Sequence, residues 1–168
     1  YSTFLQRAYD QLIHDVALQN IPVIFCIDRA GLVGEDGATH QGVFDIAYLQ
    51  AIPNLMILAP KDSVELRQTL FTLQNDNSKP VAIRYPRGYS SVENWKVPFE
   101  TIDLSKIQSI KKGKKAAVFS TGTILENVLE ALNFDTDQFA VYHFLQIKPL
   151  NEKEIIELAK DFETIITV

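Results

Sequence analysis

The stretch IDRAGLVGEDGATHQG, residues 27–42, decides the fold of this chain. It follows the apolar run IPVIFC, residues 21–26, which is rich in β-branched and aromatic side chains and is typical of a buried strand. The stretch itself combines four glycines with the charged or titratable side chains Asp28, Arg29, Glu35, Asp36 and His40. A buried strand that runs directly into such a loop is typical of the carboxyl edge of a parallel sheet, where ligands bind.

Helical and strand patterns alternate on both sides of this loop. Periodic apolar residues predict helices at 2–19, 42–52 and 61–76, and short apolar runs predict strands at 23–27, 55–60 and 80–88. Ser2 or Thr3 is a candidate N-cap for the first helix, and Asp62 or Ser63 for the third. The alternation predicts an α/β fold with a parallel sheet covered by helices on both faces.

The second half of the chain repeats this kind of alternation after an irregular stretch. Strands are predicted at 115–122, 139–144 and 164–168, helices at 124–133 and 151–162, and a short strand at 109–113. These elements indicate the beginning of a second βαβαβ unit. We therefore expect one domain at 1–90, a linker at 91–115, and a truncated second domain at 116–168.

Composition excludes several classes of protein. The 168 residues are 46% hydrophobic, which is enough for a hydrophobic core. The net charge is −5, so a basic surface that binds nucleic acid is not expected. No apolar run approaches the roughly 18 residues of a membrane span. The single cysteine, Cys26, lies in an apolar run and is expected to be a buried structural thiol. The run KKGKK, residues 111–115, is expected to be a solvated connection.

Two strand ends carry the candidate functional side chains. Arg29 could bind a phosphate or carboxylate through its forked guanidinium, and Asp36 and His40 could exchange protons if both face a cavity. The alternative is that His40 and Asp36 only anchor the loop. Arg87, in the turn that ends IRYPRG, is a phosphate candidate, whereas Arg84 is expected to be structural.

Other side chains and motifs give no comparable indication of a functional site. His14 and His143 are expected to be packing or surface residues. Scattered histidines with one cysteine do not make a zinc site. The glycines lack the spacing of a nucleotide-binding fingerprint, and the acidic residues lack that of an EF-hand.

Four motifs together resemble one family closely. They are YSTFLQRAYDQLIHDVA (1–17), DRAGLVGEDGATHQGVFDIAYLQAIPN (28–54), APKDSVELRQ (59–68) and IRYPRG (83–88). They are similar to the pyrimidine-binding domain of the 1-deoxy-D-xylulose-5-phosphate synthases, which belong to the transketolase-like thiamine diphosphate enzymes. GTILENVLEALN (122–133) and IKPLN (147–151) resemble more weakly the start of that family's C-terminal domain.

The resemblance implies a reaction and a cofactor. Synthases of this family condense pyruvate with D-glyceraldehyde 3-phosphate and release carbon dioxide, and the product feeds isoprenoid synthesis by the non-mevalonate route as well as thiamine and pyridoxal synthesis. The cofactors implied are thiamine diphosphate and magnesium. A homodimer in the bacterial cytosol or plastid stroma is implied too, with neither nucleic acid nor a membrane as partner.

The resemblance also assigns roles to individual residues. Phe4 would stack on the aminopyrimidine ring of the cofactor, and Arg7 would help to organise that pocket. Tyr1, Arg29 and Arg87 would line the acceptor site. Asp36 and His40 would contact the reacting intermediates and assist proton transfer. Spacing alone made candidates only of Arg29, Asp36, His40 and Arg87.

Part of the family's machinery does not lie in this sequence. The glutamate that activates the cofactor and the domain that holds its diphosphate and magnesium precede these motifs in the family. We therefore expect a fragment that is inactive alone. Two alternatives stay open: another enzyme of the group, either a transketolase or an oxoacid dehydrogenase E1 β subunit, or a non-catalytic fragment for dimerisation or regulation.

Overall fold

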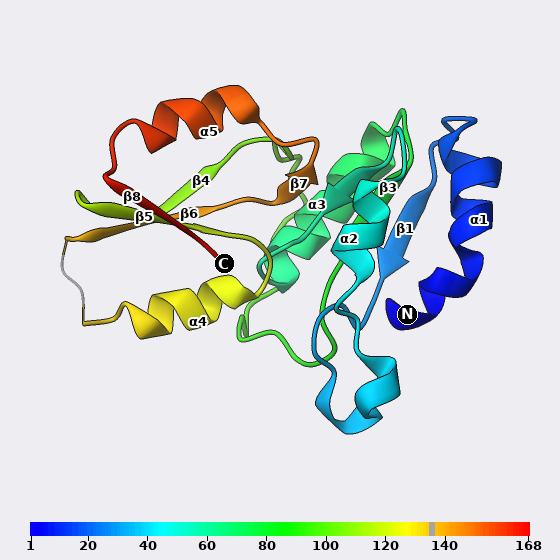
Figure 1. Cartoon of the computed structure of the whole chain (residues 1–168), viewed down its shortest axis with the longest axis horizontal. Helices are drawn as coiled ribbons and strands as arrows, with labels where there is room; N and C mark the ends of the chain where they lie inside the picture. Colours follow the sequence, from blue (N-terminus) through cyan, green and yellow to red (C-terminus); the bar gives the residue numbers. More distant parts are fainter. Residues whose placement is uncertain (135–136) are drawn as a thin grey trace.

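Two four-stranded sheets with helices against them make up the computed structural model, which describes residues 1–134 and 137–168 (Figure 1). The first sheet has the strand order β1-β3-β2-β7 and the second the order β4-β6-β5-β8. The strands are β1 Ile24–Ile27, β2 Met56–Leu58, β3 Val81–Arg84, β4 Gln108–Lys111, β5 Ala116–Ser120, β6 Phe139–His143, β7 Gln146–Lys148 and β8 Thr164–Thr167. The principal helices are α2 Asp45–Gln50, α3 Ser63–Asn75, α4 Ile124–Ala131 and α5 Glu152–Ala159.

The chain begins with a helical segment of mixed type. The 3-10 segment η1, Thr3–Ala8, continues through α1, Tyr9–Gln11, into the π-helical segment η2, Leu12–Ala17. The helix predicted at 2–19 is thus confirmed, with the shorter bounds Thr3–Ala17. Neither proposed cap is confirmed: Ser2 has helical backbone angles and its side chain makes no capping bond, and Thr3 lies within η1.

The predicted parallel sheet is confirmed in the first half of the chain. β3 pairs in parallel with β1 on one side, with Ile24 opposite Val81, and with β2 on the other, with Met56 opposite Val81. The side chains of successive strand residues point to opposite faces, so each strand contributes to two cores. The expectation of helices on both faces follows from this pattern.

Two separate apolar clusters confirm that both faces are covered. On one face, Leu12 and Ala17 of η2 and Leu49 of α2 pack on Ile57 and Ala82. On the other, α3 packs on the opposite side of the same strands through the cluster Leu58, Leu73, Val81, Ile83 and Leu145, with Leu66 and Leu70 against it. α3 begins with the predicted cap, since the Asp62 carboxylate accepts the Glu65 amide at 2.7 Å.

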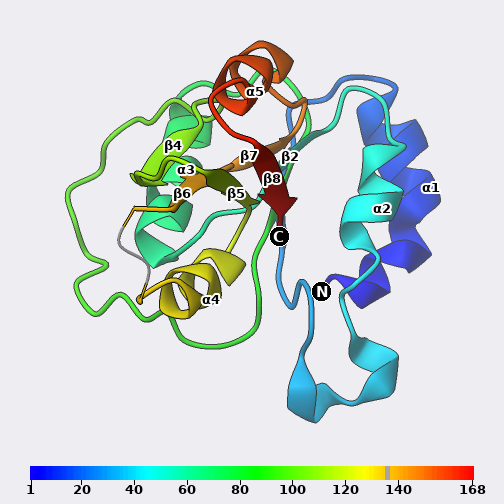
Figure 2. The same ribbon diagram turned by 60° about the vertical axis from the view of Figure 1, so that its left-hand side comes forward.

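The second sheet contains the predicted βαβαβ unit. β5 pairs in parallel with β6 and with β8, and α4 and α5 lie on opposite faces of this sheet (Figures 1 and 2). The α4 side is packed by Val118, Leu125, Val128 and Val141. The short strand expected near 109–113 is β4, which pairs antiparallel with β6.

The two sheets are joined by a strand that the sequence did not reveal. β7 follows β6 directly, yet it pairs antiparallel with β2 of the first sheet. The Lys148 ammonium of β7 also donates to the carbonyls of Gln50, at 2.9 Å, and Ile52 beyond α2. The domain limits at residues 90 and 115 stay a prediction, and β7 carries hydrogen bonds across them.

Cys26 is a correction to the expected core. It is exposed, not buried. It is two residues from Ile24 and therefore points to the same face, against which α3 packs, but among the described residues β1 is an edge strand of this sheet, hydrogen-bonded to β3 alone. Among the described residues, no helix combines the length and apolar character needed to span a membrane.

Candidate functional site

The glycine-rich loop is closed at its neck by two hydrogen bonds. Gly31 and Gly42 exchange both of their backbone bonds at 2.8 Å, and between them the loop forms two 3-10 turns, Gly34–Asp36 and Ala38–His40. Gly42 must be glycine, because a Cβ there would lie 2.2 Å from the Arg29 carbonyl oxygen and 2.7 Å from Ser2 Oγ. The loop extends beyond the sheet beside the N-terminus (Figure 2).

The start of the loop is also hydrogen-bonded to the segment after β3 and to the beginning of the chain. The Ala30 amide donates to the Tyr85 carbonyl just after β3 at 3.0 Å, and the Ser2 amide donates to the Asp28 carbonyl at 2.9 Å. Arg29 lies between these anchors with φ +57°, a left-handed conformation that non-glycine residues rarely adopt. The backbone thus holds the Arg29 side chain in place at the carboxyl edge of the sheet.

Three side chains meet at Asp36. Its carboxylate accepts the Tyr1 hydroxyl at 3.1 Å and Arg29 Nε at 3.3 Å, and Arg87 Nε lies 3.9 Å away. Arg87 also pairs with Glu35 at 3.5 Å. The loop and the IRYPRG turn are therefore brought together, as their expected places at the same sheet edge predict.

The electrostatics of this cluster keep Asp36 ionised. Desolvation acts to raise the pKa of Asp36, but the hydrogen bond from Tyr1 and the charges of Arg87 and Arg29 outweigh it, so the pKa lies below its usual range. In this conformation the group is an acceptor and a counter-ion, not a proton donor at neutral pH.

An aromatic cluster lies next to the charged one. The Phe4 ring centroid lies 4.6 Å from that of Tyr1 and 5.2 Å from that of His40, and the Arg7 guanidinium lies 5.1 Å from the Phe4 centroid. His40 is also held by a 2.9 Å contact between its Nδ1 and Thr39 Oγ1. His40 and Asp36 thus belong to two adjoining clusters that share Tyr1.

The Phe4 ring suits a flat heteroaromatic ligand. It is 38% exposed although aromatic neighbours surround it, so part of its surface is open for stacking. The residues that the resemblance assigned to a pyrimidine, Phe4 and Arg7, are adjacent and both exposed. On this observation the chain fits the pyrimidine end of thiamine diphosphate.

Arg84 and Arg87 differ in their surroundings, as expected. Arg84 Nε donates to Asp45 Oδ2 at 3.0 Å, and the Asp45 side chain is only 1% exposed, so this pair is structural and ties β3 to the start of α2. Arg87 is 40% exposed at the open edge. A hollow of about 480 Å³ between this turn and the loop is lined by Leu32, Val33, Arg87, Gly88 and Tyr89.

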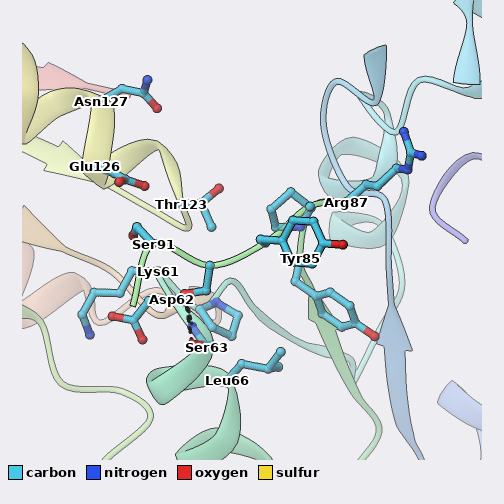
Figure 3. Close-up of a pocket in the computed structure, with 15 residues that line it drawn as sticks. Lys61, Asp62, Ser63, Leu66, Tyr85, Arg87, Ser91, Thr123, Glu126 and Asn127 are labelled. Atoms are coloured by element: carbon cyan, nitrogen blue, oxygen red, sulfur yellow. Dashed lines mark hydrogen bonds between the residues drawn. The ribbon is translucent and has the colours of Figure 1, made fainter. Parts of the chain in front are cut away.

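A second cavity, of about 400 Å³, lies on the other side of the turn (Figure 3). Its walls are the segments after β2 and β3 and the first turns of α3 and α4, with Lys61, Ser63, Ser91, Thr123 and Asn127 among the polar side chains. In Figure 3 the Arg87 side chain extends away from Thr123 and Asn127. The guanidinium therefore belongs to the loop side, where Asp36 lies.

Sequence patterns missed several partners in and around the site. Asp28, beside Arg29 in the chain, pairs with the Arg29 guanidinium and is its nearest counter-ion. His14 is exposed and pairs with Asp10, as a surface residue would. His143, in contrast, is completely buried and bonds Glu65 at 2.8 Å, a contact between residues 78 positions apart that no local pattern indicates.

Comparison with known proteins agrees with these features. The family model for the transketolase pyrimidine binding domain matches residues 1–91. The whole chain is 47% identical to part of a 1-deoxy-D-xylulose-5-phosphate synthase of Bacteroides fragilis, over 172 aligned positions, and 47% identical to part of the synthase of Vibrio vulnificus, over 168. The chain spans about a quarter of these relatives, 26% and 27% of their length.

Solved structures resemble the fold. A split-gene transketolase described as an inactive beta4 tetramer matches the whole chain and 54% of its own, with a TM-score of 0.83 and 23% identity. The transketolase of Campylobacter jejuni matches with a TM-score of 0.72 and 16% identity, over the whole chain and 30% of its own. At these identities the likeness concerns the fold alone.

Proposed function

Since the chain belongs to the transketolase pyrimidine-binding family of thiamine diphosphate enzymes, we propose that it is part of a 1-deoxy-D-xylulose-5-phosphate synthase. The full protein would condense pyruvate with D-glyceraldehyde 3-phosphate and release carbon dioxide. The identity to such synthases over the whole chain supports this choice over a transketolase or a dehydrogenase subunit. The convergence of Arg29 and Arg87 on one carboxylate is the observation that carries it.

That convergence suits a phosphorylated acceptor. Two guanidinium groups from different strand ends face the same acidic group, Asp36, and both can give charge-assisted hydrogen bonds to phosphate oxygens. Asp36 holds the two guanidinium groups at the open edge, and the Tyr1 hydroxyl also bonds Asp36 there. In the proposed function Tyr1, Arg29 and Arg87 bind the acceptor.

The aromatic cluster is assigned to the cofactor and the reacting groups. Phe4 stacks on the pyrimidine and Arg7 supports Phe4. Thiamine diphosphate, when bound, supplies the carbanion chemistry that follows loss of carbon dioxide. His40, beside Phe4 at 5.2 Å, is placed to exchange a proton with substrate oxygens. Asp36, held ionised, orients Tyr1 and the arginines and contacts the reacting intermediate.

Further properties of the full enzyme extend this proposal. Magnesium and the cofactor diphosphate would be held by a domain that this chain does not include, and the enzyme would act as a homodimer in the cytosol or plastid stroma. The product would serve isoprenoid, thiamine and pyridoxal synthesis. The 168 residues alone would be inactive, because the family's cofactor-activating glutamate is not among them.

The test is a substitution in the full-length protein. Arg87→Leu should raise the KM for D-glyceraldehyde 3-phosphate about tenfold to a hundredfold, as expected for the loss of a charged hydrogen bond, and should leave the KM for pyruvate nearly unchanged. Arg67→Leu is the matched control, because Arg67 belongs to α3 and its guanidinium lies over the Phe99 ring. Carbon dioxide release and product formation are measured together.

Other outcomes would decide against the proposal. Turnover of a ketose phosphate donor without pyruvate would indicate a transketolase, and acyl transfer to a lipoyl domain a dehydrogenase subunit. Equal effects of Arg87→Leu on both substrates would remove Arg87 from the acceptor site. Carbon dioxide release by the 168-residue chain at an ordinary enzymatic rate would show that the missing parts are not required.

A further inference from the structure

A buried polar cluster holds the second sheet against α3. The Glu65 carboxylate, 3% exposed, accepts four donors: the Lys61 amide at 2.8 Å and ammonium at 2.7 Å, Gln108 Nε2 at 2.5 Å, and His143 Nε2 at 2.8 Å. Lys61 and Glu65 belong to the first half of the chain, whereas Gln108 and His143 are opposite each other on β4 and β6. The cluster therefore crosses the join between the two halves.

A second buried polar residue, Ser120, is the register partner of His143 on the neighbouring strand. His143 is fully buried and Ser120 is 1% exposed. Within residues 1–134 and 137–168, neither His143 Nδ1 nor Ser120 Oγ has a hydrogen-bond partner. Buried polar atoms in proteins are nearly always bonded, because leaving one unpaired costs about 1–3 kcal/mol.

The strand register places these two side chains next to each other. Ser120 and His143 are register partners in the parallel pair of β5 and β6, so their side chains point to the same face of neighbouring strands about 4.8 Å apart. A water molecule in such a place needs two or more polar partners, and internal waters typically bind otherwise unsatisfied groups of this kind. A hydroxyl and an imidazole nitrogen supply both donor and acceptor functions.

The order hydroxyl, imidazole, carboxylate also occurs in nucleophilic catalysis, but it does not serve catalysis here. Ser120 and His143 are 1% and 0% exposed, so a substrate cannot reach the hydroxyl in this conformation. A nucleophile must touch the atom it attacks. The arrangement is therefore internal.

We propose that Ser120 Oγ and His143 Nδ1 bind one internal water molecule, which completes a continuous hydrogen-bonded chain from β5 through His143 to Glu65 on α3. The chain couples the second sheet to the first turn of α3 in a single arrangement, since every polar member is satisfied only when β4, β5, β6 and α3 are all in place. Ser120 is then a water ligand and a positioning residue for His143.

The test is a double-mutant cycle in the 168-residue chain. Ser120→Ala removes the hydroxyl. His143→Gln keeps a side-chain donor for Glu65 but removes the atom at the Nδ1 position. Ser120→Ala alone should lower the folding equilibrium constant about tenfold. In the His143→Gln background, the reduction caused by Ser120→Ala should be smaller by a factor of at least about five. Ser120→Ala combined with exposed His14→Gln is the control and should be additive.

Additivity of Ser120→Ala and His143→Gln would overturn the proposal. A second measurement does not need a variant to fold: nuclear Overhauser effects between a long-lived water and the His143 ring should be seen in the unsubstituted chain. Their absence, with the ring resonances assigned, would equally refute the shared water. Their presence together with coupling would establish it.

Discussion

Glu65 offers the sharpest test of the physical reasoning, because the stability it contributes must depend on pH in a defined direction. Burial acts to raise the pKa of Glu65, but the hydrogen bond and charge of His143 and the charge and hydrogen bond of Lys61 outweigh it and lower the pKa to about 2. The perturbation is Glu65→Gln, which removes the charge and one acceptor oxygen while it keeps the size of the side chain.

The magnitude follows from the shift. The folded-state pKa of about 2 compares with an ordinary value of 4.5. At 1.36 kcal/mol per unit, the difference amounts to about 3 kcal/mol of stability. Because the folded pKa is depressed, this contribution is complete above about pH 4.5 and is lost as the pH falls through about 2. The side chain is only 3% exposed, so solvent screening reduces it little.

The assay is urea denaturation of the 168-residue chain between pH 7 and pH 2. Glu65→Gln should be about 3 kcal/mol less stable at pH 7, and the difference from the unsubstituted chain should shrink as the pH falls. Glu157→Gln is the matched control, because Glu157 is 71% exposed in its pair with Lys160 and should change stability by less than about 1 kcal/mol. Parallel pH profiles for Glu65→Gln and the unsubstituted chain would refute the reasoning.

Three further predictions concern the loop and its surroundings. Gly42→Ala places a Cβ 2.2 Å from the Arg29 carbonyl, so it should cost about 1–3 kcal/mol and speed hydrogen exchange at the loop neck; unchanged exchange would contradict the close contact. Arg84→Met leaves the buried Asp45 carboxylate unpaired and should cost about 3–5 kcal/mol in urea denaturation, whereas a cost below about 1 kcal/mol would show that the pair is not structural. Phe4→Ala in the full-length protein should weaken thiamine diphosphate binding about tenfold by calorimetry, and unchanged affinity would remove the stacking role.

Part of the candidate site can be predicted from which residues follow the parallel strands. Arg29 and Arg87 come from segments about sixty positions apart, yet both follow parallel strands of one sheet, so their proximity was predictable without coordinates. Arg84 alternates into the interior and was expected to be structural, as its pair with Asp45 confirms. The contact of both site arginines with Asp36 depends on the loop conformation, which periodicity does not describe.

The sequence by itself determined the order and type of most elements, because helix and strand periodicity report which face of each segment is buried. It also limited the cap of α3 to Asp62 or Ser63, of which Asp62 is the one observed, since capping acts within one turn. Only the tertiary structure decided that β7 joins the first sheet, that Cys26 is exposed on an outer strand, and that His143 meets Glu65. Each of these depends on which distant segment lies alongside, and the energy of burial and pairing is set by that neighbour, not by the residues next in the chain.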